Sequence, residues 1–239
     1  RLPTEESHHL NDFASINGAK GSAGIKSLTS ADSLSVTSTN ENSITSTVAA
    51  TSAAIAWSSG GDKSGFAATG AGSRAKNDIY ISTTAEVVGD AKTSSVLKSG
   101  INSDLTISAI DTASIDATSW GASLAFSFAG GETKFSVAPA VGLTLADNTI
   151  RRDLKAILNG FKSVAIPGTT TVSTTSNGSI TSKATAVAIS ASVAFKSSAG
   201  LSGGGAHSFN TITGNNQALL KDLSFSSDAD TATKSGEVK

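Results

Sequence analysis

Hydrophobic and polar residues alternate along three long segments of the chain. From position 187 to 195 the sequence reads VAISASVAF, so that Val187, Ile189 and Val193 share one face. The same alternation recurs at residues 122–128 (ASLAFSF) and 51–57 (TSAAIAW). A period of two over runs of this length is typical of β-strands. We therefore expect three long strands, each with its larger side chains on one face.

The opposite face of each predicted strand consists of Ala and Ser and carries no charge. An antiparallel sheet with one solvated face normally places charged and polar residues such as Lys, Glu and Thr on that side. The small face is therefore expected to be covered, either by another layer of the same molecule or by a neighbouring subunit. This pattern predicts strands that are covered on both sides.

Glycine-rich segments follow the three predicted strands, at residues 58–61, 129–132 and 197–205. Glycine at such points favours tight corners, and alternation resumes after each of them. Only residues 148–162 show a helical spacing of apolar positions, and they predict one short helix on a β framework. The positions that carry this stripe are Ile150, Leu154, Ile157, Leu158 and Phe161.

Three sets of landmarks repeat along the chain. Residues 33–46, 104–117 and 170–183 each read as a short strand, a polar turn and a Ser-Ile pair. Such repetition predicts three degenerate tandem units at residues 33–101, 102–168 and 169–239, after an extended lead-in segment at residues 1–32. An Asn-x-Ile landmark follows in each unit, and its Asn either joins a ladder of stacked amides or begins a turn. The aligned positions are Ile44, Ile115 and Ile180, then Asn77, Asn148 and Asn210, then Ala85, Ala156 and Ala218.

Composition excludes several classes of function. The chain has no Cys, which removes disulfides, thiolate metal sites and thiol nucleophiles. Its 18 basic and 19 acidic residues nearly balance, so an electropositive surface for nucleic acid is not expected. No apolar run approaches the roughly 18 residues of a membrane helix. We therefore expect neither a nucleic-acid partner nor a membrane span.

Motifs for catalysis and cofactor binding are weak. The run Gly203-Gly204-Gly205 lacks the Lys-Ser/Thr that completes a phosphate-binding loop, and no Gly-x-Ser-x-Gly elbow occurs. The three histidines, His8, His9 and His207, are expected to be solvated. The sequence therefore predicts no enzyme and no catalytic residue. A lyase or hydrolase would need clustered charges in a groove, and outside the lead-in segment only residues 151–153 (Arg-Arg-Asp) are densely charged.

Calcium is the one cofactor that the sequence leaves open. Neither the Gly-Gly-x-Gly-x-Asp nonapeptide nor an EF-hand loop occurs. Isolated turn aspartates are weak candidates for calcium ligands, although ordinary turn chemistry explains them equally well. These candidates are Asp62, Asp90, Asp228 and Asp230.

The repeated units resemble the very large repetitive surface and secreted proteins of Gram-negative bacteria, of the adhesin or surface-filament type with tandem β repeats. The resemblance is carried by SITSTVAATSAAIAW with KNDI, SIDATSWGASLAFSF with DNTI, and SITSKATAVAISASVAF with FNTI. It implies an elongated β architecture, export to the cell surface or the extracellular space, and a scaffolding or adhesive role without catalysis.

We expect an all-β fold, an elongated β-solenoid or stacked β-layer of three degenerate repeats. A β-sandwich-like subunit with an exchanged terminal strand is the alternative. The expected function is a structural subunit or segment of an extracellular filament, surface layer or giant adhesin, which self-assembles through β edges and small-residue faces. The alternative is a module of an adhesin that binds carbohydrate or another surface ligand. Such a module needs an exposed cluster of aromatics and amides, whereas Trp57 and Trp120 both lie in the predicted long strands.

Overall fold

The structure, a computed structural model, describes residues 4–17, 25–59, 64–90, 95–100, 103–130, 135–194 and 196–225. Every regular element within these ranges is a strand, and every strand pairing is parallel, which confirms the all-β class. The strands are β1 (Thr4–Asn17), β2 (Ser27–Thr29), β3 (Leu34–Asn40), β4 (Ser43–Ser59), β5 (Gly65–Phe66), β6 (Thr69–Val88), β7 (Val96–Lys98), β8 (Leu105–Asp111), β9 (Ser114–Gly130), β10 (Ser136–Asn159), β11 (Ser163–Ala165), β12 (Thr170–Ser176), β13 (Ser179–Ala194) and β14 (Ser198–Lys221).

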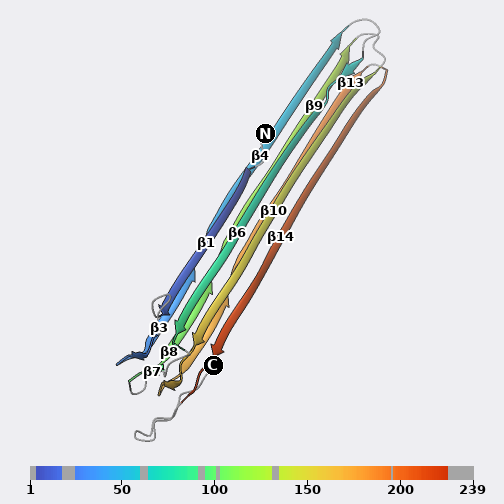
Figure 1. Cartoon of the computed structure of the whole chain (residues 1–239). Coiled ribbons are helices and arrows are strands. Elements are labelled where there is room, and N and C mark those ends of the chain that lie inside the picture. Colours follow the sequence, from blue (N-terminus) through green and yellow to red (C-terminus); the bar gives the residue numbers. More distant parts are fainter. Residues whose placement is uncertain are drawn as a thin grey trace.

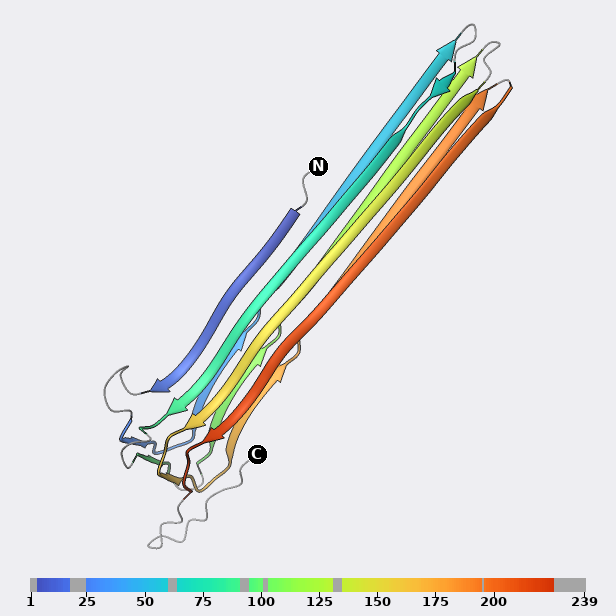
Figure 2. The same ribbon diagram turned by 45° about the vertical axis from the view of Figure 1, so that its right-hand side comes forward.

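The chain runs out and back three times along one axis (Figures 1 and 2). Each outgoing path consists of a three-residue strand, then a seven-residue strand, and then a long strand, which is β4, β9 or β13. The first return path consists of the short strand β5 and the long strand β6, and the other two are the single long strands β10 and β14. β1 is a further return strand that precedes the first turn. We call the end that carries β2, β7 and β11 the proximal end. The end at which β4, β9 and β13 finish is the distal end.

Equivalent strands of successive turns pair side by side. The return sheet has the order β1-β6-β10-β14, and β5 also pairs with β10. The outgoing paths form three smaller sheets of three strands each, β2-β7-β11, β3-β8-β12 and β4-β9-β13. The repeat landmarks of the sequence are lateral partners in this arrangement: Ile44 with Ile115 and Ile180, Asn77 with Asn148 and Asn210, and Ala85 with Ala156 and Ala218.

The space between the return sheet and the outgoing sheets is filled by side chains that become smaller toward the distal end. The proximal core contains large residues, among them Leu105, Leu154 and Phe161. Five isoleucines dominate the middle core, and the distal core consists of Ala125, Ala138 and Ala140 with Ala188 against it. Gly142 marks how closely the layers approach there, because a Cβ on it would lie 3.0 Å from the carbonyl oxygen of Val187. The distal half therefore has a thin interior that only small residues fit.

The long outgoing strands β4, β9 and β13 turn their small residues toward that interior, although side-chain size alone suggests that their large residues lie inside. In β9 the small residues Gly121, Ser123 and Ala125 are buried, while Phe126 is partly exposed and Phe128 is exposed. The small faces are thus covered by another layer of the same molecule, which is one of the two covers expected for them. Within the single chain these strands are covered on one side only, because the large residues of β4, β9 and β13 point outward, so cover on both sides is not confirmed.

Two local predictions are wrong. Residues 148–162 do not form a helix, because all but the last three lie in β10, where they pair with both β6 and β14. Ile150, Leu154 and Leu158 point inward, as the helical stripe requires, but Ile157 points outward and Arg152 between them is buried. The predicted corner at residues 197–205 is instead the start of β14. Its glycines lie in the thin distal half, and a Cβ on Gly204 would lie 3.2 Å from the carbonyl oxygen of Ala186.

Candidate assembly surfaces

Both ends of the stack present unpaired strand edges within the described residues. β14 pairs with β10 along its whole length, and no described strand pairs with its other edge. The other end is stepped. β1 covers β6 only from Ala75 to Val88, and no described strand pairs with the outer edge of residues 69–74 of β6 or with that of β4. Unpaired backbone N–H and C=O groups in a long straight strand are a template for a further strand.

A ladder of asparagine amides runs along the stacking axis inside the molecule. The side-chain Nδ2 of Asn77 donates to Oδ1 of Asn148 at 2.7 Å, and Nδ2 of Asn148 donates to Oδ1 of Asn210 at 2.8 Å. Each amide also donates across the interior to the outgoing strand, Asn77 to Ser46 at 3.0 Å and Asn148 to Ser182 at 3.1 Å. Of the two roles that the sequence left open for these asparagines, the structure shows the ladder.

The ladder reaches an open surface at β14. Asn77 and Asn148 are buried, whereas Asn210 lies on the exposed strand β14. At the other end, Glu6 of β1 is the register partner of Asn77. A strand added beside β14 would therefore meet an amide already oriented along the stack.

A buried ion pair lies at the bend between the two longer strands of the outgoing path. Nε of Arg152 is 3.3 Å from Oδ2 of Asp111, with side-chain exposures of 5% and 0%. The guanidinium also donates from Nη1 to the hydroxyl of Ser176. Gly178 and Gly214 pack so closely against Arg152 that a Cβ on either would lie 2.3 Å from its side chain. The enclosure on all sides indicates a structural role for this charge.

The pairing register of the seven-residue strands explains the position of Asp111, which was not predicted from the sequence. Asn40, Asp111 and Ser176 are lateral partners that each end a seven-residue strand. Nδ2 of Asn40 donates to Asp12 of β1, and Oδ1 of Asp111 accepts from the backbone N–H of Ala113 at 3.0 Å. The common position after a short alternating strand was the available signal, but Asn, Asp and Ser share no chemistry that distinguishes them from turn residues.

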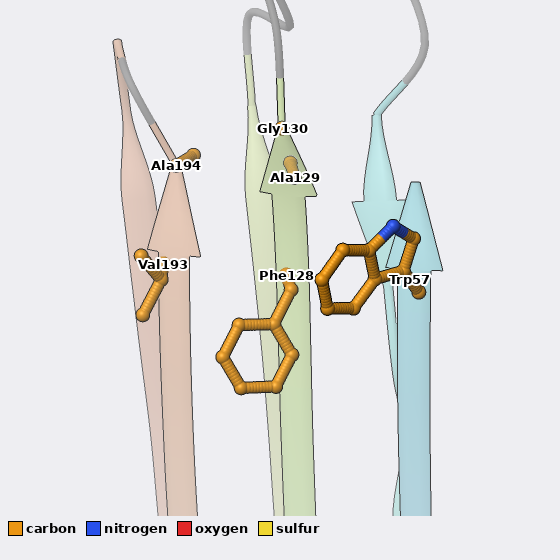
Figure 3. A pocket seen from close by; sticks show the side chains of 6 residues that line it. All are labelled: Trp57, Phe128, Ala129, Gly130, Val193 and Ala194. Carbon is orange, nitrogen blue, oxygen red and sulfur yellow. The ribbon is translucent and has the colours of Figure 1, made fainter. Parts of the chain in front are cut away.

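The outward face of β4, β9 and β13 is apolar in its distal half. We call this surface the aromatic face, and it consists of Ile55, Trp57, Leu124, Phe126, Phe128, Val187, Ile189 and Val193. Trp57 is the most exposed of them at 76%, and its ring centroid lies 5.8 Å from that of Phe128. A hollow of about 480 Å³ lies beside these rings and is also lined by Val193, Ala129, Gly130 and Ala194 (Figure 3).

The return sheet becomes apolar at the same level along the strands. Ser73 and Ser119 face each other across the interior at 2.9 Å, next to Trp120 on the outgoing side. Arg74 and Asp147, which are 2.6 Å apart, are the last charged residues on the return strands before that level. Beyond it the described strand segments contain no Asp, Glu, Lys or Arg. These segments are residues 49–59, 69–73, 120–130, 136–145, 185–194 and 198–206.

A second hollow, of about 430 Å³, lies at the open end formed by β4 and β6. It is lined by Trp120, Thr51, Gly70 and Gly72 together with Ala49, Ala50 and Ala71. Trp120 is 41% exposed. This hollow differs from the one on the aromatic face because it lies at the outer edge of β6, where no described strand pairs with Gly70 or Gly72.

The calcium candidates are not brought together. Asp62, Asp228 and Asp230 lie outside the described residues, and Asp90 lies after β6, where its backbone N–H donates to the hydroxyl of Ser95 at 2.8 Å. No group of three or more potential metal ligands occurs among the described residues. The charged triplet at residues 151–153 is also divided, because Arg152 points inward while Asp153 forms an ion pair with Lys155 at 2.6 Å.

Comparisons with known proteins give no relative for this chain. No protein-family model matches it, and neither the curated proteins nor the solved structures yield a significant match. In the part of the chain that the structure describes, no helix of the length and hydrophobicity needed to cross a membrane occurs.

Proposed function

We propose that the chain is a β-solenoid that serves as a structural subunit or segment of an extracellular filament, surface layer or giant adhesin. The open strand edges at both ends carry this proposal. A solenoid gains stability from each added turn, and its terminal turns remain adhesive unless they are capped. Assembly uses these edges and not the small-residue faces, which are enclosed between the two layers.

The register of the existing ladders predicts how two copies join. Ser15 of β1 pairs with Glu86, Glu86 with Ile157, and Ile157 with Leu219 of β14. If β14 of one copy adds to the free edge of β1 in the next copy with this register kept, Leu219 lies beside Ser15. Both side chains are exposed, so the contact needs no rearrangement of the interior.

Engineered cysteines test this joint directly, because the chain has no Cys of its own. Adjacent strands place paired Cα atoms about 5 Å apart, within disulfide range. Within one copy, Ser15 and Leu219 are separated by three strand spacings, roughly 14 Å, so an intramolecular bond is impossible. We expect the Ser15→Cys/Leu219→Cys variant to give a ladder of disulfide-linked multimers on mild oxidation, and negative-stain images to show fibres that grow with concentration.

The matched control shifts the second cysteine along the same face of β14. In Ser15→Cys/Gln217→Cys the partner lies two residues away from the register position, which puts the Cα atoms about 8 Å apart and beyond disulfide reach. A stable monomer across a wide concentration range, with no cross-linked ladder in either variant, would refute self-assembly. Equal ladders in both variants would refute the register.

The carbohydrate-binding alternative is supported by the hollow around Trp120, where an exposed indole lies beside Thr51 and the outer edge of β6 at Gly70 and Gly72. Glycan-array binding that is abolished by Trp120→Ala would establish it. Binding that is unchanged by the substitution, or no binding at all, would remove it.

A further inference from the structure

The distal half of the molecule has its large apolar residues outside and its small residues inside. Within the described residues Ile55 is 74% exposed, Trp57 76%, Ile189 52% and Val193 58%, while Ser123, Ala125 and Ser127 are buried. Contiguous exposed apolar surface of this kind marks an interaction site in a soluble protein. The edge pairing proposed above does not cover it, because strand edges and outward faces point in perpendicular directions.

We propose that the aromatic face binds the aromatic face of a second copy, with the two sheets packed face to face about a two-fold axis parallel to the strands. The face is self-complementary under this operation. Trp57, Phe128 and Val193 are lateral neighbours at one level, with Phe128 in the middle. The two-fold axis therefore places Trp57 of each copy over Val193 of the other and Phe128 against its counterpart.

The shape of the face fits that contact. Trp57 stands on β4 at one side of the face, and the hollow of about 480 Å³ extends past Phe128 to Val193 and Ala194 on β13 at the other side (Figure 3). The indole of one copy is thus positioned to fill the hollow of its partner. An interface in which each copy supplies the same projection and the same recess is the isologous type found in two-fold dimers.

A lipid bilayer is the main competing occupant, and the open edges argue against it. The apolar band from Trp120 to Phe128 spans nine residues, or about 27 Å, close to the thickness of a bilayer core. However, hydrocarbon offers no hydrogen bonds, and unpaired strand edges do not occur in it. Insertion would place the outer edges of β14 and of residues 69–73 of β6 in hydrocarbon, and no described strand pairs with either edge. Face-to-face packing of two copies leaves those edges in water or paired with a further copy.

A sugar is a weaker candidate for this face than for the hollow around Trp120. The only polar side-chain group among the six residues that line the aromatic-face hollow is the indole N–H of Trp57. The remaining lining side chains are Phe, Ala and Val, which cannot orient hydroxyl groups by hydrogen bonding.

The area of the aromatic face sets the expected strength of the pairing between two copies. Three strands about 4.8 Å apart and about 27 Å long give a footprint near 400 Å² per copy, roughly half of what a stable pair buries. A single pair of copies should therefore associate weakly and reversibly. The footprint grows with every copy added at the strand edges, so strong pairing, seen as paired or bundled fibres, rests on the proposed end-to-end assembly.

Cross-linking at the two-fold axis tests the pairing. Phe126 is outward-facing on the middle strand β9, so Phe126→Cys lies near its own counterpart only if the aromatic faces meet. The proposed edge-to-edge joint offsets successive copies by the four strands of the return sheet, so it keeps two such cysteines about 19 Å apart. We expect a short bismaleimide, which traps a weak and reversible pair, to convert Phe126→Cys to covalent dimers. Leu143→Cys, at an outward position of the apolar part of the return sheet, should stay monomeric.

Further variants and a vesicle-binding measurement distinguish pairing through the aromatic face from pairing through the return sheet and from binding to lipid. Trp57→Thr in the Phe126→Cys background should lower dimer yield severalfold, while Phe209→Thr, an exposed aromatic on β14 outside the face, should leave it unchanged. Cross-linking of Leu143→Cys but not of Phe126→Cys would overturn the choice of face. A bimane probe on Phe126→Cys that shifts to the blue with neutral phosphatidylcholine vesicles, and not with added protein, would overturn the choice of partner. Fibres that form without lateral pairing would refute this inference alone, whereas dimers without fibres would refute only the end-to-end proposal.

Discussion

Asn148 is the residue whose removal should weaken the interior polar ladder most. In the variant Asn148→Ala three hydrogen bonds are lost: the bond accepted from Asn77 and the bonds donated to Asn210 and Ser182. The net value of such a bond is about 1 kcal/mol, so the loss should be about 3 kcal/mol. Asn77 keeps its bond to Ser46, but its second Nδ2 hydrogen loses its acceptor in the interior, so that sum is the lower end of the expected cost.

Asn210→Ala is the matched control, because it removes the same side chain at the exposed end of the ladder. Only the single bond accepted from Asn148 is lost, for which we expect about 1 kcal/mol. With an m value of about 2 kcal/mol per molar urea, the two variants should differ in unfolding midpoint by about 1 M. The measurement is urea unfolding followed by far-ultraviolet circular dichroism, with equal m values as the requirement for comparison. Equal midpoints for the two variants would show that the ladder is not a stabilising element.

Two further predictions concern the other buried polar groups. Asp111→Asn should destabilise the fold by about 3–5 kcal/mol because it leaves Arg152 buried without its counter-charge, and adding Arg152→Met should restore part of that loss in the same urea assay. Ser127→Ala should cost about 1 kcal/mol, since the hydroxyl bonds Ser136 at 2.7 Å, whereas Ser123→Ala should be neutral or stabilising because no hydrogen-bond partner is described for the hydroxyl of Ser123. Thermal unfolding that ranks Ser123→Ala below Ser127→Ala would contradict this assignment.

Lateral pairing explains both what the sequence predicted and what it did not. Ile44, Ile115 and Ile180 could be aligned by eye because parallel in-register pairing places like residues beside like residues. The interpretation of residues 148–162 as a helix used only local spacing, in which a buried Arg152 interrupts the alternation. Hydrogen bonding to strands on both sides, with partners 71 residues before and 62 residues after Asn148, outweighs that local preference.

The direction of the strand faces could not be predicted from the size of the side chains. Large side chains mark the buried face of a strand only where the core is thick enough to enclose them, as at the proximal end around Leu154 and Phe161. In the distal half the two layers approach until a Cβ on Gly142 would touch the opposite backbone, so size selects against large residues inside. The alternation of large and small side chains was therefore detectable in the sequence. Which of the two faces inward depends on the distance between the layers, and no single segment of the sequence encodes that distance.

The distance between the layers also bears on where charged residues lie on the outer surface. Ion pairs such as Arg74–Asp147, Lys76–Asp78 and Lys155–Asp153 all lie on the part of the return sheet proximal to Ser73, where water is the expected neighbour. The distal strand segments lack charges and present Trp57 and Ile55 instead, although their interior of Ala and Ser gains little from burial. Residues that contribute little to the stability of the single chain and remain hydrophobic are most simply explained by a partner. A low charge on this half of the surface is what the proposed contact between two aromatic faces requires.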